Sequence, residues 1–248
     1  GVAPYTVVAV WGVESNYGQT FGKRPLVTSL ATLSCFGRRQ AFFRSEFMTT
    51  LKILDEGHVA PESLVGSWAG AFGPTQFMPT AFKRYAVDAD GDGRRDVVDN
   101  AYDLIASTAN NLKKDGWQSG ATWGYEVTIP RGFDFMLADR RKAMTLAQWD
   151  QQGVRRANGK PYPNPTEKAY LLAPAGSQGP GFLMLQNFRV IMKYNPAEAY
   201  ALAIGHFADR LRGGPPFVQP WPRQERVLSR SERLELQQLL AQRGLHKG

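Results

Sequence analysis

The amino-acid sequence predicts a mainly helical (α+β) protein with a small strand-containing insertion. Apolar residues recur at helical spacing along most of the chain, whereas strict alternation is confined to a short stretch before Pro130. Two capping boxes, each a Ser or Thr followed three residues later by Gln or Glu, mark helix starts. With 248 residues, 43% of them hydrophobic, the chain can form one large domain with a substantial core, and predominant disorder is excluded.

Helical spacing of apolar residues predicts three helices in the first half of the chain. They cover residues 4–18, 39–56 and 100–114. Pro4 suits the first turn of the first helix, and a glycine follows the end of each helix. Residues 66–80 are dense in glycine, aromatic residues and proline, which predicts a functional loop that leads into a short helix.

The composition changes over residues 117–165, which we interpret as the insertion. Residues 125–129 alternate apolar and polar side chains before Pro130, which indicates a short strand. Thr145 and Gln148 have capping-box spacing, so a short helix is expected to begin there.

The last third of the chain predicts one long helix, a linker and a terminal helix. The long helix is expected after Asn195, with Pro196 at its first position, and to end near Leu211. We therefore assign residues 1–214 to one domain and the proline-rich residues 215–228 to a linker. Residues 229–248 begin with the second capping box, Ser229 to Glu232, and form a terminal helix.

The overall charge favours an acidic or polyanionic partner. Thirty Lys and Arg against 22 Asp and Glu give a net charge of +8. The basic residues are scattered and no nucleic-acid motif is present, so nucleic acid is not the expected partner. The single cysteine, Cys35, excludes an internal disulfide and a thiolate metal cluster, and no apolar run is long enough for a transmembrane segment.

The most specific local pattern is an acidic loop at residues 88–99. Carboxylates occupy loop positions 1, 3, 5, 9 and 12, Gly93 occupies the sharp turn at position 6, and position 7 supplies a backbone carbonyl. The predicted ligands are Asp88, Asp90, Asp92, Arg94 (through its carbonyl), Asp96 and Asp99. We expect a structural Ca²⁺, or Na⁺ or Mg²⁺, because these oxygens nearly fill a coordination shell; a solvated acidic turn is the alternative.

A lone glutamate, Glu14, lies at the predicted end of the first helix. The negative end of the helix dipole and burial beside Trp11 and Tyr17 would both favour its protonated form. A neutral carboxyl in a cleft suits general-acid cleavage of a glycosidic bond, although most helical glutamates are surface residues. No second carboxylate is close in sequence, so the substrate would have to supply the nucleophile, as an N-acetyl group can.

Several separated blocks resemble the B-type lytic murein transglycosylases. The matching blocks are residues 11–18, 37–43, 66–79, 88–99, 116–117, 187–188, 194–195 and 200–202. The resemblance covers residues 2–211 and implies a lysozyme-like helical catalytic core with an EF-hand-like loop. It also implies a periplasmic enzyme of a Gram-negative bacterium, soluble or attached to the outer membrane through a segment that precedes Gly1.

The resemblance carries over to individual residues. It implies that Glu14 is the single catalytic acid and base, and that no cofactor is needed for the chemistry. It implies that seven residues contact the substrate: Arg38, Arg39, Ser67, Gln76, Phe77, Tyr194 and Asn195. Each has a structural alternative: a helix cap for Asn195, a turn for Ser67, the core for Phe77 and ordinary surface charge for the arginines.

Three functions are therefore compared. The first is non-hydrolytic cleavage of the MurNAc–GlcNAc bond of peptidoglycan glycan strands to 1,6-anhydroMurNAc products. The second is a hydrolytic muramidase, and the third is a non-catalytic peptidoglycan-binding protein. The terminal helix is similar to the start of a peptidoglycan-binding module, and other cell-wall enzymes are conceivable partners.

Overall fold

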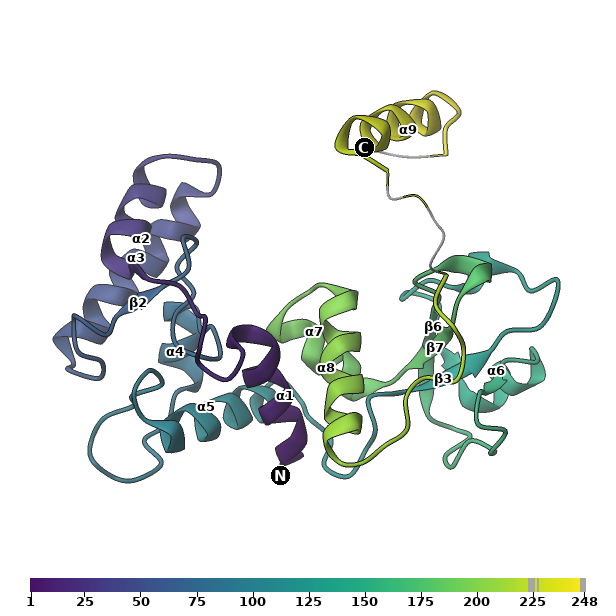
Figure 1. The fold of residues 1–248 in the computed structure, drawn as a ribbon, viewed down its shortest axis with the longest axis horizontal. Coiled ribbons are helices and arrows are strands. Elements are labelled where there is room, and N and C mark those ends of the chain that lie inside the picture. Colours follow the sequence, from purple (N-terminus) through teal and green to yellow (C-terminus); the bar gives the residue numbers. More distant parts are fainter. Residues whose placement is uncertain (223–225, 227, 246–248) are drawn as a thin grey trace.

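The computed structural model describes residues 1–222, 226 and 228–245, and it has a helical lobe beside a sheet lobe (Figure 1). We use "helical lobe" for residues 4–114 and 186–211, and "sheet lobe" for residues 124–184. The predicted mainly helical (α+β) class is confirmed. None of the helices in the described residues is long and apolar enough to cross a membrane.

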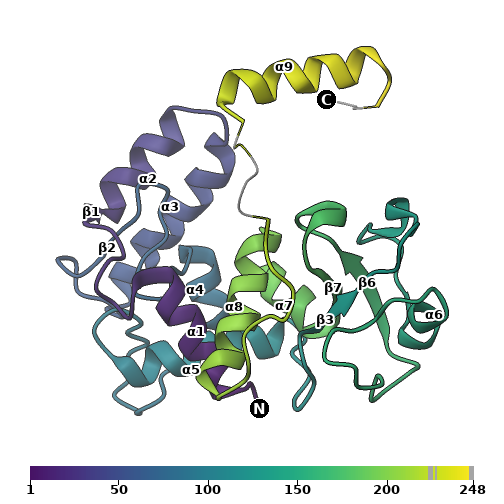
Figure 2. The same ribbon diagram turned by 45° about the vertical axis from the view of Figure 1, so that its right-hand side comes forward.

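The helical lobe is built around a pair of helices that come from opposite ends of the domain. Its helices are α1 (Pro4–Ser15), α2 (Leu26–Cys35), α3 (Gln40–Asp55), α4 (Pro79–Tyr85), α5 (Ala101–Lys114), α7 (Gln186–Tyr194) and α8 (Glu198–Leu211). α1 packs along α8, and α2 packs against α3 as a hairpin at the outer end of the lobe (Figures 1 and 2). The short strands β1 (Arg24–Pro25) and β2 (Val65–Gly66) pair antiparallel.

The predicted helices of the first half are confirmed, with one end corrected. The observed α3 and α5 agree with the predicted ranges within one residue, and the Asn100 side chain caps α5 by accepting the Tyr102 N–H at 3.0 Å. α1 ends at Ser15 and not at Gly18, because Asn16 and Tyr17 adopt positive φ angles of 49° and 59°. The prediction missed α2 and α7.

The helix expected directly after Asn195 begins two residues later than predicted. Asn195 ends α7, and its side-chain oxygen accepts the Ala197 N–H at 3.1 Å. Ala197 is the N-cap of α8 and provides no side-chain hydrogen bond. Asn195 therefore stabilises the turn between two helices instead of capping the second one.

The sheet lobe is a five-stranded sheet that extends beyond the predicted insertion. Its strands are β3 (Gly124–Thr128), β4 (Met144–Thr145), β5 (Arg155–Arg156), β6 (Lys168–Leu172) and β7 (Gly181–Met184), in the order β4-β6-β7-β3-β5. The predicted strand corresponds to β3, and Thr145 with Gln148 forms the predicted capping box of α6 (Leu146–Gln151). The boundary at residue 165 was too early, because β6 and β7 pair antiparallel with each other and β7 with β3.

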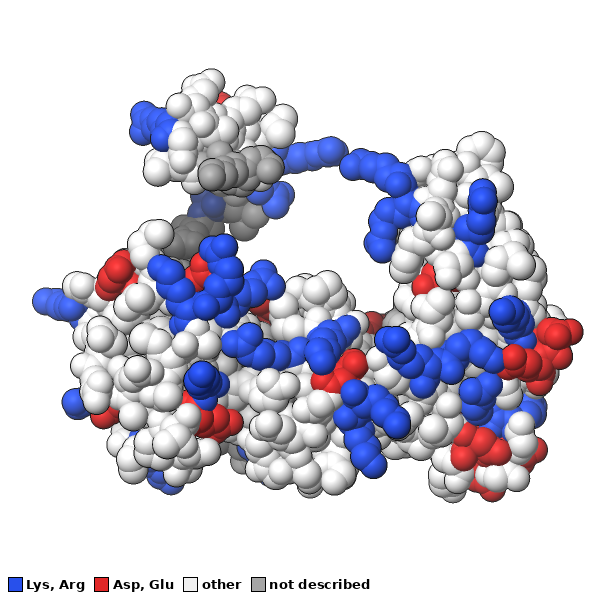
Figure 3. Space-filling view, turned by 180° about the vertical axis from the view of Figure 1, so that it is seen from behind, with Lys and Arg blue, Asp and Glu red and all other residues white. Residues whose placement is uncertain are grey.

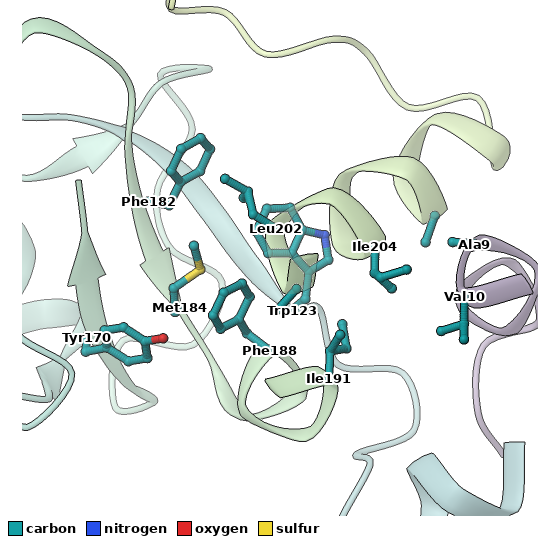
Figure 4. Packing of buried hydrophobic residues seen from close by; sticks show 12 residues of the cluster. Ala9, Val10, Trp123, Tyr170, Phe182, Met184, Phe188, Ile191, Leu202 and Ile204 are labelled. Atoms are coloured by element: carbon teal, nitrogen blue, oxygen red, sulfur yellow. The ribbon is translucent and has the colours of Figure 1, made fainter. Parts of the chain in front are cut away.

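A shared hydrophobic cluster joins the two lobes (Figure 4). Trp123, Phe182 and Met184 from the sheet side meet Phe188 of α7 and Ile204 of α8 in this cluster. α8 carries a glycine where the indole approaches: a Cβ at Gly205 would lie 2.6 Å from a Trp123 ring carbon. The sheet lobe therefore packs directly against α7 and α8.

The first part of the predicted linker, residues 215–228, packs on the sheet lobe. The Phe217 ring lies 4.9 Å, centroid to centroid, from that of Phe182. The Glu126 carboxylate accepts the backbone N–H groups of Val218 at 2.8 Å and Gln219 at 2.7 Å. Residues 223–225 and 227 of this segment lie outside the described residues.

The terminal helix, α9 (Arg230–Gln242), begins at the predicted capping box of Ser229 and Glu232 and buries no side chain. The end of this predicted unit, residues 246–248, lies outside the described residues. Lysine and arginine side chains are spread in a broad band over both lobes (Figure 3). On this face the positive charge is not concentrated on one element.

Candidate active site

Glu14 lies in the last turn of α1, where the helix packs against α8. Its side chain is half-buried, and this burial raises the pKa of its carboxyl above the ordinary value. The neighbouring Tyr200 hydroxyl has the opposite, smaller effect on the pKa. The helix dipole also disfavours a negative charge at this end. The predicted burial of Glu14 is therefore present and stabilises the protonated acid, and the neighbour that acts on its carboxyl is Tyr200.

Two tyrosines from the far end of the domain lie close to this carboxyl. Burial raises the pKa of both Tyr194 and Tyr200 well above the ordinary value, and the negative charge of Glu14 raises it further. Both phenols are therefore neutral hydrogen-bond donors near pH 7. The buried Tyr200 hydroxyl has no hydrogen-bond partner of good geometry among the described residues, so it is available to a substrate or to Glu14.

Tyr200 was missed as a functional side chain in the sequence analysis, where it appeared only within a matching block. It lies in the first turn of α8, 186 positions after Glu14. Only the packing of α1 against α8 brings the two together, and a sequence pattern does not reveal that packing. Ser15, which directly follows Glu14, was also missed as a functional side chain, because its partner Pro74 is far away in the sequence.

Ser15 connects the end of α1 to the loop at residues 66–79. Its hydroxyl donates to the Pro74 carbonyl at 2.6 Å and accepts the Gly18 N–H at 2.8 Å. Ser15 is 1% exposed, so both bonds are shielded from water. The position of Glu14 is thereby fixed relative to this loop.

The loop at residues 66–79 is held by a compact set of backbone hydrogen bonds. The backbones of Phe72 and Phe77 exchange hydrogen bonds of 2.9 Å in both directions. Gln76, between them, adopts a positive φ of 56°. Its side-chain nitrogen donates to the carbonyls of Phe21 at 3.1 Å and Gly73 at 3.0 Å. These bonds orient the amide and leave its oxygen available for a ligand.

A cavity of about 300 Å³ brings Gln76 and Tyr194 together. The Tyr194 hydroxyl donates to the Thr75 carbonyl at 2.5 Å, which fixes the ring on the same loop. The other residues that line the cavity are Phe77, Met78, Ala81, Arg84, Tyr85, Asn111, Asp115 and Lys193. Three of the predicted substrate-binding residues, Gln76, Phe77 and Tyr194, therefore line one pocket.

Phe77 and Ser67 contribute to the packing and hydrogen bonding of the loop itself. The Phe77 ring is 2% exposed and lies edge-on to Tyr194, with ring centroids 6.3 Å apart. It packs in the core and also lines the cavity of Gln76 and Tyr194, so its contact with a sugar stays a prediction. The exposed ring of this loop is Trp68. The Ser67 hydroxyl accepts the Ala71 N–H at 3.1 Å within the turn.

The predicted basic pair, Arg38 and Arg39, lies on a different segment of the helical lobe from Glu14. Arg38 and Arg39 are exposed in the turn between α2 and α3, and the Arg39 guanidinium lies 4.1 Å from the centroid of the Phe42 ring. No described hydrogen bond or ion pair links either arginine to the residues around Glu14. Their role toward a substrate stays a prediction.

The acidic loop brings only part of the predicted ligand set together. The carboxylate oxygens of Asp88, Asp90 and Asp103 lie within 4.8 Å of one another. Asp103, on α5, was not predicted because it lies outside the loop pattern. It is fully buried, and its two oxygens accept the N–H groups of Ala89 and Asp96, each at 2.7 Å. Three clustered carboxylates suit a hard cation that prefers oxygen ligands.

Two of the other predicted ligands, Asp92 and Asp96, hold the loop's own backbone. Asp92 accepts the Arg94 N–H at 2.7 Å, and the buried Asp96 accepts the N–H groups of Val98 at 2.9 Å and Asp99 at 3.0 Å. The Arg94 side chain also donates to Asp96 at 3.2 Å. Asp99 is exposed. Asp88 also accepts the N–H groups of Gly91 and Gly93, so carboxylates of the cluster shape the turn as well.

The comparisons with known proteins identify the class. A family model described as the transglycosylase SLT domain matches residues 1–209, so the chain belongs to this family of transglycosylase domains. The chain is 33% identical over 210 residues to the membrane-bound lytic murein transglycosylase B of Escherichia coli (strain K12). That match covers 82% of this chain and 55% of the relative. The chain therefore spans about half the length of this curated relative.

Solved structures agree with the family. The crystal structure of SltB3 from Pseudomonas aeruginosa in complex with NAG-NAM-pentapeptide has a TM-score of 0.93 and 50% identity. It covers 97% of this chain and 65% of that one. The Escherichia coli lytic transglycosylase Slt35 in complex with calcium has a TM-score of 0.74 and 31% identity, with coverage of 85% and 66%.

Proposed function

We propose that this chain is the catalytic part of a peptidoglycan lytic transglycosylase with Glu14 as its single acid and base. The observation that carries the proposal is the half-buried carboxyl of Glu14, whose pKa is raised by burial. Among the described residues, the only neighbouring group that shifts the pKa of Glu14 is the Tyr200 hydroxyl, and no second carboxylate does so. This favours a single acid over the pair of carboxylates that a hydrolytic glycosidase uses.

The proposed reaction uses the substrate's own groups and consumes no water. Protonated Glu14 donates its proton to the glycosidic oxygen between MurNAc and GlcNAc, and the bond from C1 to that oxygen breaks. The 2-acetamido oxygen bonds to C1 and forms an oxazolinium-like species. Ionised Glu14 then takes the proton of the C6 hydroxyl, whose oxygen attacks C1 and displaces the acetamido oxygen. The product is a 1,6-anhydroMurNAc end.

The polar residues around Glu14 support this sequence of steps. The neutral Tyr200 hydroxyl can donate a hydrogen bond to the carboxylate that forms after the first step. Gln76 and Tyr194 face one cavity and can orient a sugar in it. The net charge of +8 suits a polymer whose lactyl groups and stem peptides carry carboxylates.

The test is digestion of purified peptidoglycan sacculi, with mass spectrometry of the released fragments. We expect anhydro ends from the native chain and a loss of at least 10²-fold in rate for Glu14→Gln, since general acid–base catalysis contributes about 10²–10⁴-fold. The matched control is Glu62→Gln, which changes an exposed glutamate and should leave the rate unchanged. Reducing ends would establish a hydrolytic muramidase, and binding without turnover a non-catalytic protein.

We also propose that the acidic loop binds a structural cation, Ca²⁺ in the first place and Na⁺ or Mg²⁺ otherwise. The carboxylates of Asp88, Asp90 and Asp103 provide the oxygen donors, and they lie away from Glu14 on a different loop and helix. A relative was solved in complex with calcium. The cation has no part in the proposed chemistry.

Calcium titration tests this site. A cation at 100 times its dissociation constant stabilises the folded state by about 2.7 kcal/mol. We expect Ca²⁺ to raise the melting temperature of the native chain and to have much less effect on Asp88→Asn. An unchanged melting temperature at millimolar Ca²⁺, Mg²⁺ and Na⁺ would reject the site.

The proposed location in the cell follows from the substrate. An enzyme that cleaves peptidoglycan works in the cell envelope, and we propose the periplasm of a Gram-negative bacterium. The residue ranges of the predicted organisation are kept, with residues 1–214 as the catalytic domain and residues 229–248 as the start of a wall-binding module. Residues 217–221 pack on the sheet lobe. This packing supports the proposal that the linker leaves the catalytic domain in a fixed direction.

A further inference from the structure

A groove of about 720 Å³ lies between the sheet lobe and the C-terminal end of α8. Its volume is within the range of about 300–1,000 Å³ that is usual for ligand sites. Tyr125 of β3, Arg156 of β5 and Glu167 line it from the sheet lobe, and Asp209 of α8 and Phe217 line it from the other side. We call this cavity the lobe groove.

The lobe groove is separate from the candidate active site. Tyr200, beside Glu14, lies in the first turn of α8, whereas Asp209 and Arg212 of the groove lie at the other end of the helix. Nine residues separate Tyr200 from Asp209, which at 1.5 Å per residue is about 14 Å along the helix axis. None of the residues that line the groove lines the cavity of Gln76 and Tyr194.

The walls of the lobe groove are fixed by contacts within the chain. The Trp123 indole N–H donates to the Asp209 carboxylate at 2.9 Å. The His206 and Phe217 rings stack with their centroids 3.7 Å apart. Glu126 holds the segment after α8 through two backbone N–H groups. The groove is therefore formed before any ligand enters, which lowers the entropic cost of binding.

Apart from Glu126, two charged groups of the groove have no ion pair among the described residues: Arg156, whose guanidinium donates to the Pro161 carbonyl at 2.9 Å, and the Glu167 carboxylate. Asp209 pairs with Arg212 at 2.8 Å, and both oxygens of Glu126 accept backbone N–H groups. The Glu167 carboxylate has no ion pair or hydrogen bond with any side chain or backbone group that the structure describes. Glu167 is only partly exposed, and burial raises the pKa of its carboxyl. A cation from a ligand would relieve this unfavourable burial.

The aromatic rings of the groove argue against a sugar as the ligand. The Arg156 guanidinium lies 4.7 Å from the centroid of the Tyr125 ring and covers that face, and the imidazole of His206 covers Phe217. Stacking on a sugar would need an open ring face. The polar groups at the edge are the Tyr125 hydroxyl and the side-chain amide nitrogens of Asn158 and Asn164, whose oxygens accept the Lys160 N–H and the Thr166 hydroxyl. These suit the backbone of a peptide.

We propose that the lobe groove binds a peptide that carries a free primary amine, with the Glu167 carboxylate as the partner of the ammonium group. The inference rests on the proposed function, because the stem peptides of peptidoglycan supply such amines next to the glycan. The groove would hold a stem peptide while the glycan strand occupies the cleft at Glu14. It would thus add a second point of attachment to the same polymer.

The test is an NMR titration of the isotope-labelled chain with a free stem peptide, compared with the same peptide after N-acetylation of its side-chain amine. We expect the amine-bearing peptide to shift backbone signals of residues 122–126, 156–158 and 163–167. Acetylation of the peptide, or Glu167→Gln in the protein, should weaken binding at least fivefold. The matched control is Asp150→Asn, an exposed carboxylate on the neighbouring surface, which should change binding less than twofold.

Three results would overturn the proposal. They are equal binding of the free and acetylated peptides, shifts confined to the residues around Glu14 and Gln76, and no shift at millimolar peptide. The sacculus assay separates this inference from the proposed function. Glu167→Gln should still release anhydro ends from glycan strands stripped of peptide, at the native rate. If the native chain released none, the proposed function would fail while amine-dependent binding could still stand.

Discussion

Glu14 and the acidic loop use the same functional group in opposite ways. Glu14 is alone, half-buried at the negative end of α1, and no described backbone N–H donates to its carboxyl; burial raises its pKa. Asp90 is exposed and its pKa is lowered, mainly by a hydrogen bond of 2.7 Å from the Asn100 side chain. The first environment favours the proton and the second favours the charge.

This difference teaches that the surroundings of a carboxylate decide whether it holds a proton or a charge. A proton donor needs burial without compensating donors, and a cation ligand needs its charge stabilised before the ion arrives. The chain meets the two needs with a helix end in one region and a turn rich in N–H donors in the other. Three changes test how far the two regions are specialised, in order of decreasing effect.

The largest effect is expected from shortening the catalytic side chain. Glu14→Asp keeps a carboxyl group but withdraws it by one methylene from the bond that it must protonate. A misplacement of about 1 Å can cost about 10²-fold in rate, so we expect the rate of anhydro-product release to fall at least that far. The matched change in the other region is Asp90→Glu, which should leave that rate within twofold of native. Equal losses would mean that the two regions are not functionally separate.

A loss of stability without a loss of specific activity is expected at Asp103. Asp103→Asn replaces one of the two oxygens that accept the N–H groups of Ala89 and Asp96. Leaving one buried N–H unsatisfied costs about 1–3 kcal/mol in the free energy of unfolding. Urea unfolding measures it, with the exposed Asp99→Asn as a control expected within about 0.5 kcal/mol of native. Equal stability of the two variants would contradict the assigned hydrogen bonds.

The smallest effect is expected from removing one hydroxyl beside Glu14. The Tyr200 hydroxyl favours the ionised carboxyl and lowers its pKa, so Tyr200→Phe should raise that pKa further. The acid must be protonated in the first step, and activity is lost as the pH rises through this pKa. We therefore expect the alkaline limb of the kcat/KM profile to move to higher pH. Tyr5→Phe, an exposed tyrosine of the same lobe, should leave the profile unchanged, and a shift to lower pH in Tyr200→Phe would contradict the assigned role.

The local signals in the sequence predicted the helices that carry their own start and stop residues. α5 and α9 have side-chain caps, α3 is followed by a glycine, and all three were placed correctly. α2 begins after Pro25 without a side-chain cap and contains several β-branched residues, so its helical character was not evident. β6 and β7 are short apolar runs that are almost entirely buried, and such runs do not distinguish strand from helix.

The residues of the candidate site also fall into those that local patterns predicted and those that were missed. Glu14 was singled out from a helix end together with the family resemblance, and Asp88 and Asp90 from loop spacing, because these features lie within a few residues of one another. Tyr200, Ser15 and Asp103 were missed because their partners are far away in the chain or outside the loop pattern. The near-complete burial of Phe77 was not predicted, because a pattern does not tell which side of a loop its rings face.

The sequence by itself determined the mainly helical class, the solitary acid at the end of α1 and the oxygen-rich turn, since each depends on interactions over a few residues. Only the tertiary structure decided that α8 covers Glu14, that Asp103 joins the acidic loop and that the lobe groove exists. Burial and long-range contacts set those features. They depend on which surfaces exclude water together, and that is fixed only when the whole chain has folded.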